Sequence, residues 1–127
     1  MSRTVLVVDD SDIIRRVVIR CLELSHVAVE TILEAGNGNE ALDQLAEHQV
    51  DLMLCDLHMP ELDGISLLHQ LAADKRLATL PVVVISSDRS EERRAELKQL
   101  GVRQFLSKPF TPESVGDAIA AHLECSP

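Results

Sequence analysis

Short apolar runs alternate with longer amphipathic segments along the chain, and this alternation limits the possible folds more than any other feature. An apolar run of about four to eight residues bounded by turn residues is typical of a buried strand, whereas apolar residues three and four positions apart are typical of a helix. Strands that alternate with helices form a parallel sheet with helices on both faces. The predicted strands are residues 4–8, 31–33, 52–55, 82–85 and 102–106.

The segments between and after the strands predict helices. The first segment has apolar residues at helical spacing, which predicts one buried face, with Ser11 or Asp12 as the N-cap. Further helices are predicted after Gly38, after Gly64, over residues 91–100 with Gly101 as the cap, and from Pro112 with Thr111 as the N-cap. In the first helix the apolar face is Ile13, Ile14, Val17, Val18, Cys21 and Leu22, and the opposite face carries Arg15, Arg16 and Arg20.

Five β-α units leave few arrangements, because crossover connections between parallel strands are right-handed. The expected fold is a doubly wound, flavodoxin-like α/β sheet with strand order 2-1-3-4-5 and five helices. A length of 127 residues predicts one domain, and no linker or low-complexity segment divides the chain. We therefore expect a single domain over residues 1–127.

Charge and composition argue against several classes of function. A formal net charge of −9 and the absence of Trp and Tyr argue against direct nucleic-acid binding, which needs cationic patches and often stacking aromatics. No apolar run approaches the ~18 residues that cross a bilayer, so no membrane association is expected. Cys21 and Cys55 fall within apolar patterns, which predicts buried thiols. Their spacing is typical neither of a zinc site nor of a disulfide framework, so a cytoplasmic protein is expected.

Polar residues stand directly after the predicted strands. Asp9 and Asp10 follow the first strand, Asp56 the third, Ser86 the fourth and Lys108 the fifth. In a doubly wound sheet the carboxyl ends of the strands meet at one edge, and the first, third and fourth strands are neighbours. Three carboxylates are therefore expected to converge there, where they repel one another unless a proton or a cation is bound.

This set of residues predicts a phosphoryl site. Carboxylate ligands favour Mg²⁺, and no His or Cys stands at these strand ends to favour zinc. A carboxylate beside a metal ion, an ammonium group and a hydroxyl can receive a phosphoryl group. We predict that Asp56, on the middle strand, is the nucleophile and that Asp9 and Asp10 hold the metal. Lys108 and Ser86 are the predicted contacts to the phosphoryl oxygens.

Taken in order, these residues resemble the receiver domain of two-component response regulators, most of all the single-domain chemotaxis type. The resemblance spans essentially the whole chain. It implies that Asp56 accepts a phosphoryl group from a sensor histidine kinase or a phosphotransfer protein in a Mg²⁺-dependent reaction. The matching segments are Asp9-Asp10, DLHMPELDG from Asp56 to Gly64, Ser86 after PVVVI, and Lys108-Pro109-Phe110.

The resemblance also implies roles for single residues. Asp10 would bind Mg²⁺ directly with Asp9 assisting, and Asp56 and the backbone carbonyl of His58 would complete the protein ligands. Ser86 would move toward the phosphoryl group, and Phe105 would then rotate inward. The surface of the fourth helix, fifth strand and fifth helix would change and bind a downstream protein or a fused effector domain. The Lys108-Pro109 peptide bond would be cis, and enzymatic activity would be limited to self-phosphorylation and autodephosphorylation.

Two other functions share parts of the pattern. A haloacid-dehalogenase-like phosphatase also uses an aspartyl nucleophile and is the alternative prediction. It needs an Asp two residues after the nucleophile, where this chain has His58, and a cap insertion. A flavin-binding module has the same fold, but no Ser/Thr-rich loop follows the first strand and the acids would repel a flavin phosphate. Whether the chain acts alone or as part of a longer regulator stays open.

Overall fold

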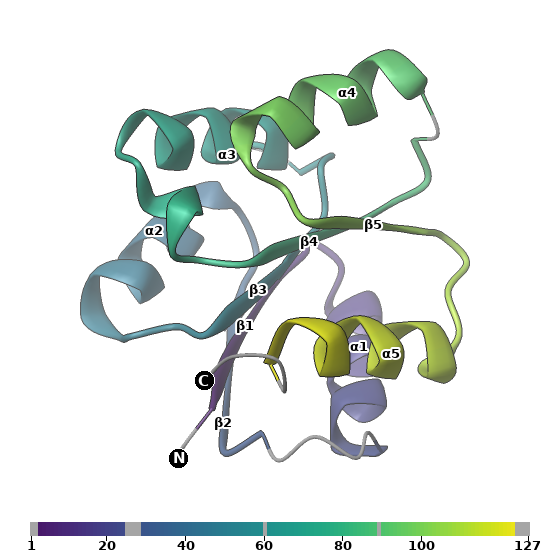
Figure 1. The fold of residues 1–127 in the computed structure, drawn as a ribbon. Coiled ribbons are helices and arrows are strands. Elements are labelled where there is room, and N and C mark those ends of the chain that lie inside the picture. Colours follow the sequence, from purple (N-terminus) through teal and green to yellow (C-terminus); the bar gives the residue numbers. More distant parts are fainter. Residues whose placement is uncertain (1–2, 25–28, 60, 89, 124–127) are drawn as a thin grey trace.

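The structure, a computed structural model, describes residues 3–24, 29–59, 61–88 and 90–123. Strands and helices alternate in it as predicted (Figure 1). A short 3-10 helix, η1, precedes the fourth strand and was not expected from the sequence. The elements are β1 (Thr4–Val8), α1 (Asp12–Leu24), β2 (Thr31–Ala35), α2 (Gly38–Glu47), β3 (Leu52–Cys55), α3 (Gly64–Ala73), η1 (Arg76–Ala78), β4 (Val82–Ser86), α4 (Glu91–Leu100), β5 (Gln104–Ser107) and α5 (Pro112–Leu123).

The strands form one parallel sheet with the order β2-β1-β3-β4-β5, which confirms the predicted doubly wound, flavodoxin-like fold. The register pairs Val8 with Cys55 at the ends of β1 and β3. It pairs Ser86 with Ser107 at the ends of β4 and β5. The residues that follow neighbouring strands therefore emerge side by side at one edge of the sheet.

Helices cover both faces of the sheet: α1 and α5 lie on one face, and α2, α3 and α4 lie on the other (Figure 1). Alternate strand residues supply the two cores, since side chains along a strand point to opposite faces. Leu54 and Val83 pack with α1 and α5, whereas Met53 and Val84 pack with α3 and α4. All residues of β3 and β4 are buried, as expected for central parallel strands. These strands form a rigid base for the residues at their carboxyl ends.

The helix ends follow the predicted capping signals. Ser11 is the N-cap of α1, because its Oγ accepts a hydrogen bond from the Ile14 N–H at 3.2 Å. Thr111 Oγ1 accepts one from the Ser114 N–H at 3.0 Å at the start of α5. Gly101 ends α4 with a φ of 119°, a left-handed conformation that favours glycine.

Three strands differ from their predicted bounds. β4 ends one residue later than predicted, at Ser86. β2 continues two residues further, to Ala35, because its pairing with β1 extends as far as Val8. β5 covers Gln104–Ser107 instead of residues 102–106. Val102 is buried, but its N–H bonds to the carbonyl of Leu97 at 3.1 Å and so closes the last turn of α4.

The predicted buried face of α1 is wrong at two positions. Val18, Cys21 and Leu22 are buried, but Ile13 is 71% exposed and Val17 is 45% exposed. The apolar stripe of α1 is wider than the surface that the sheet and α5 cover. Two large apolar side chains therefore stay in contact with solvent in the first half of the helix.

Cys21 and Cys55 are buried free thiols, as predicted. Burial raises the pKa of the Cys55 thiol far above its ordinary value, so this thiol stays protonated and unreactive. Within the described ranges, none of the helices is long and apolar enough to span a membrane.

Candidate functional site

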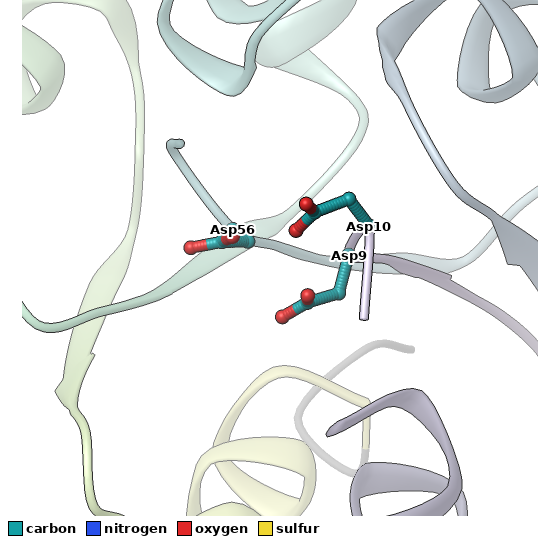
Figure 2. Close-up of side chains that lie close together, drawn as sticks. All are labelled: Asp9, Asp10 and Asp56. Carbon is teal, nitrogen blue, oxygen red and sulfur yellow. The ribbon is translucent and has the colours of Figure 1, made fainter. Parts of the chain in front are cut away.

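Three carboxylates gather at the carboxyl ends of β1 and β3 (Figure 2). Asp9 and Asp10 directly follow β1, and Asp56 directly follows β3. One oxygen from each of the three side chains lies within 4.8 Å of the others. Asp9 and Asp56 are 4% and 6% exposed, whereas Asp10 is open to solvent. The structure thus brings together the three acids that the sequence predicts to converge.

The loop between β1 and α1 holds Asp9 in place. Asp9 Oδ1 accepts a hydrogen bond from the Ser11 N–H at 2.9 Å, and the Asp9 carbonyl accepts one from the Arg15 guanidinium at 2.5 Å. Arg15 also pairs with Asp12 and, through Nε, with Glu34 Oε1 at 3.0 Å. The sequence pattern assigns Arg15 to the solvent face of α1, but its side chain is only 15% exposed. It joins α1 and β2 to the end of β1.

Backbone groups position Asp56. Its Oδ1 accepts a hydrogen bond from the Leu57 N–H at 2.9 Å, and its own N–H bonds to the Val8 carbonyl at 2.9 Å. Gly64 begins α3 directly against this turn. A Cβ at Gly64 would lie 2.0 Å from the Asp56 carbonyl oxygen and 2.8 Å from the Leu57 Cα. Only glycine allows α3 to come this close to Asp56. From the sequence, Gly64 is recognisable only as a turn residue, so this steric requirement is not predicted.

Lys108 supplies a positive charge to the site. It follows β5, and its N–H donates a hydrogen bond to the Ser86 carbonyl at 3.1 Å. Its Nζ lies 3.2 Å from Asp9 Oδ2 and 3.5 Å from Asp56 Oδ1. The Lys108–Pro109 peptide bond is cis, as predicted. The ammonium group therefore bridges the two buried carboxylates.

This single ammonium does not neutralise the cluster. Burial raises the pKa of Asp56, and the neighbouring Asp9 carboxylate raises it further. Lys108 and the Leu57 N–H act in the opposite direction and offset part of this effect. Close like charges in a poorly solvated place destabilise the ionised form. The site is therefore favourable for an additional cation.

The donor set fits a divalent metal ion. All three side chains offer carboxylate oxygens that are close enough to share one ion. The exposed Asp10 leaves one side open, so that a bound ion could keep water ligands, as Mg²⁺ usually does. In the described part of the chain the cluster includes no His or Cys, which disfavours zinc. The cluster can thus hold Mg²⁺ or a similar ion through Asp9, Asp10 and Asp56.

Ser86 and Phe105, the two predicted switch residues, lie on β4 and β5. Ser86 is the last residue of β4 and is 3% exposed, and its Oγ accepts a hydrogen bond from the Asp88 N–H at 3.1 Å. Phe105 is half-buried against the core that α3 and α4 cover. It pairs in register with Val84, two residues before Ser86. Phe105 is therefore outside the acidic cluster, but in the sheet it lies near Ser86.

His58 lies in the loop after β3, two residues beyond Asp56. Its side chain is 59% exposed, and Nε2 lies 3.8 Å from Asp88 Oδ2. This pair links the loops after β3 and β4 next to the carboxylates. The role of the His58 backbone carbonyl as a metal ligand stays a prediction, and Pro60 of the same loop is outside the described residues.

Comparison with known proteins agrees with this arrangement. The family model for the response regulator receiver domain matches residues 5–120. The chemotaxis protein CheY1 of Helicobacter pylori strain J99 is 34% identical over 119 residues, which cover 93% of this chain and 94% of that protein. The receiver domain of the Francisella response regulator 1452 has a TM-score of 0.85 at 29% identity, and the alignment covers 98% of this chain and 99% of that chain.

A more distant structure shares the fold alone. It is a CheX–CheY–BeF3–Mg²⁺ complex from Borrelia burgdorferi, with a TM-score of 0.81 at 24% identity over 94% of this chain and 87% of that chain. The family match gives no support to the haloacid-dehalogenase-like alternative. The acids, the hydroxyl and the lysine stand at the carboxyl ends of the strands, and the family model matches most of the sequence. The chain therefore belongs to the response regulator receiver domain family, whose members act in two-component signalling.

Proposed function

We propose that the chain is a CheY-like phosphorylation switch in which Asp56 accepts a phosphoryl group from the phosphohistidine of a sensor kinase or phosphotransfer protein. The observation that carries this proposal is the position of Lys108 Nζ, 3.2 Å from Asp9 and 3.5 Å from Asp56. An ammonium group at this point can contact an oxygen of a phosphoryl group on Asp56 while it stays in the site. We propose that this receiver domain comprises residues 1–127.

Asp56 has the properties of the nucleophile. Its contacts to Leu57 and Lys108 involve Oδ1, so Oδ2 has no hydrogen bond within the described residues. Attack by Oδ2 on the phosphorus of a phosphohistidine forms an O–P bond and breaks the P–N bond, whose electron pair returns to the imidazole. Lys108 Nζ and Ser86 Oγ would then donate to the phosphoryl oxygens.

We assign the metal site to Asp9, Asp10, Asp56 and the His58 carbonyl, and the metal to Mg²⁺. When bound, the ion would offset the charges of the carboxylates and of the incoming phosphoryl group. The acidic cluster supports this assignment, as does the presence of Mg²⁺ in the Borrelia CheY complex. Asp9 also keeps Lys108 in the site through their 3.2 Å contact.

The proposed output is a change of surface. Phosphorylation adds about −1.5 to −2 charges and strong hydrogen-bond acceptors at the carboxylates. Ser86 Oγ, which now accepts from the Asp88 N–H, would turn to donate to the phosphoryl group, and Phe105 would rotate inward. The surface of α4, β5 and α5 would then bind a downstream protein or a fused effector domain.

The exposed end of α1 supports the docking of a protein donor. An apolar groove lined by Ile14, Val17, Lys108, Pro109 and Phe110 opens beside the acidic cluster. Ile13, in the first turn of the same helix, is also largely exposed. Exposed apolar residues that adjoin a reactive group are typical of an interaction site. We propose that this α1 groove receives the segment of the donor protein that carries the phosphohistidine.

Replacing Ile13 with serine is expected to slow phosphorylation by a protein donor about ten-fold, which corresponds to ~1.4 kcal/mol of lost contact. Phosphorylation by acetyl phosphate should stay unchanged, because this small donor needs no docking surface. The measurement is the initial rate of phosphate transfer from each donor. Leu24→Ser is the matched control, since Leu24 is 59% exposed on the same helix but lies at its other end. Equal slowing with both donors, or equal slowing by both variants, would contradict the assignment.

Acetyl phosphate with Mg²⁺ is expected to add one phosphate to the protein, as detected by intact-mass spectrometry. EDTA should prevent the addition, because the charges at Asp9, Asp10 and Asp56 would then repel the donor. We expect no turnover of external phosphate esters. Absence of the adduct in the presence of Mg²⁺ would refute the proposed function, and steady ester hydrolysis without a protein-bound phosphate would favour a phosphatase.

We further propose that the chemistry of the chain is limited to its own phosphorylation and dephosphorylation. Water would remove the phosphate, and the nearby pair of His58 and Asp88 would influence how fast it does so. The protein is proposed to act in the cytoplasm, where the two buried thiols, Cys21 and Cys55, remain reduced.

A further inference from the structure

We infer that Arg94 of α4 is a positioning residue that holds Phe105 in its present orientation and thereby sets how easily the protein switches. This inference rests on the switch proposed above and adds a residue to it. Neither the sequence pattern nor the acidic cluster identifies Arg94, because this residue of α4 contacts residues of another element, β5.

The Arg94 guanidinium contacts two residues of β5. Its Cζ lies 5.5 Å from the centroid of the Phe105 ring, and its Nη2 donates a hydrogen bond to Ser107 Oγ at 3.2 Å. Side chains two positions apart on a strand share one face of the sheet, so one guanidinium can reach both. A cation within about 6 Å of a ring centroid is attracted to the ring. Arg94 therefore stabilises Phe105 in the orientation that the structure shows.

Arg94 is also linked to the acidic site through Ser107. Ser107 pairs in register with Ser86, and the next residue, Lys108, donates its N–H to the Ser86 carbonyl at 3.1 Å. A displacement of Ser86 or Lys108 toward a phosphoryl group would therefore move Ser107. The hydrogen bond from Arg94 to Ser107 and the contact with Phe105 would be weakened together.

The arrangement of Arg94 is only weakly favourable. Its Nε is buried and has no hydrogen-bond partner in the part of the chain that the structure describes. An unpaired buried N–H destabilises the state that contains it. This penalty opposes the two favourable contacts of the guanidinium. A small free-energy change at Ser86 and Lys108 is therefore enough to release Arg94 and free the Phe105 ring.

Contacts present only in the unphosphorylated state lower the affinity of the protein for a phosphoryl group. Arg94→Met is accordingly expected to bind beryllofluoride with Mg²⁺ about three- to ten-fold more tightly than the wild type, from the usual strength of a cation–π contact. Titration followed by NMR measures this affinity. Arg93→Met is the matched control, because Arg93 is on the same helix but pairs with Glu96 at 2.7 Å. It should bind like the wild type.

NMR of the aromatic side chains provides a second readout that a merely structural role would not change. The chain has two Phe and no Trp or Tyr, so the signals of Phe105 are readily identified. In Arg94→Met without beryllofluoride they should shift toward their positions in the beryllofluoride-bound wild type. Arg94→Lys, which keeps the cation, should shift them less. Ser107→Ala should shift them in the same direction as Arg94→Met.

Each outcome has a definite meaning. Unchanged or weaker beryllofluoride binding by Arg94→Met, in a variant whose urea unfolding shows an intact fold, overturns the role of Arg94. The same is true if Arg93→Met behaves like Arg94→Met. If the wild type itself binds no beryllofluoride with Mg²⁺, the proposed function fails and the inference fails with it.

Discussion

Asp56→Asn is expected to abolish phosphorylation and to stabilise the metal-free protein. Asparagine keeps the shape of the side chain and the oxygen that accepts from the Leu57 N–H, but its amide is a poor nucleophile. It also removes a carboxylate whose pKa is raised by burial and, to a smaller extent, by repulsion from Asp9. Two like charges in close contact repel each other by ~4 kcal/mol, and Lys108 compensates most of this repulsion. We therefore expect a gain of roughly 1 kcal/mol in the free energy of unfolding. Intact-mass spectrometry and urea unfolding in EDTA measure the two effects.

The stability gain should depend on pH in a defined direction. The folded pKa of Asp56 is raised, so the folded state binds this proton more tightly than the unfolded state. The penalty for the ionised side chain is present at neutral pH and disappears as the pH falls through the raised folded pKa. The difference between Asp56→Asn and the wild type should therefore shrink in acid.

Asp117→Asn, which removes an exposed carboxylate of α5, is the control for Asp56→Asn. It should leave phosphorylation unchanged and alter stability by less than about 0.5 kcal/mol. A destabilised Asp56→Asn protein, or one that still gains phosphate, would contradict the role of Asp56. Mg²⁺ should stabilise the wild type more than Asp56→Asn, since the variant has one metal-binding carboxylate fewer.

Gly64→Ala is expected to lower the free energy of unfolding by about 3 kcal/mol or more, at the upper end of the usual cost of overpacking. The added Cβ would lie 2.0 Å from the Asp56 carbonyl oxygen and 2.8 Å from the Leu57 Cα. These neighbours are backbone atoms and cannot turn aside, so α3 or the turn after β3 must move. Urea unfolding measures the loss. The rate of phosphorylation by acetyl phosphate should also fall, because the displaced turn carries Asp56.

Gly36→Ala serves as the control for Gly64→Ala. Atoms near a Cβ at Gly36 are the ends of the Arg15 and Glu40 side chains, all 3.6 Å away, which is ordinary contact. This variant should change stability by less than about 0.5 kcal/mol. If both variants unfold alike, the close approach of α3 to Asp56 does not control the position of Asp56.

The sequence by itself determined the order of elements, the sheet topology and the identity of the acidic residues. Apolar periodicity is a local property, and it correctly predicts β1, β3 and the five helices, and β4 except for its last residue. The polar residues that end these strands are also local features. Once the strand order follows from the β-α alternation, the carboxyl ends of β1 and β3 must be neighbours. Asp9, Asp10 and Asp56 therefore converge without any further information.

Only the tertiary structure decided which side chains make contacts between elements. The exposure of Ile13 and Val17 depends on how much of α1 is covered by the sheet and α5. The first residue of β5 depends on where the last turn of α4 closes. Sequence periodicity records whether a helix or strand has an apolar face, but not how much of that face its neighbours cover.

The same limit applies to three residues that support the site. Arg15, Gly64 and Arg94 each act on a residue of another element or loop: the Asp9 carbonyl, the Asp56 backbone and the Phe105 ring. A charged residue on a helix is read as solvent-facing and a glycine as a turn, because local patterns carry no information about distant partners. The nature of the phosphoryl site was thus readable from the chain, whereas the contacts that hold and control it arise from long-range packing.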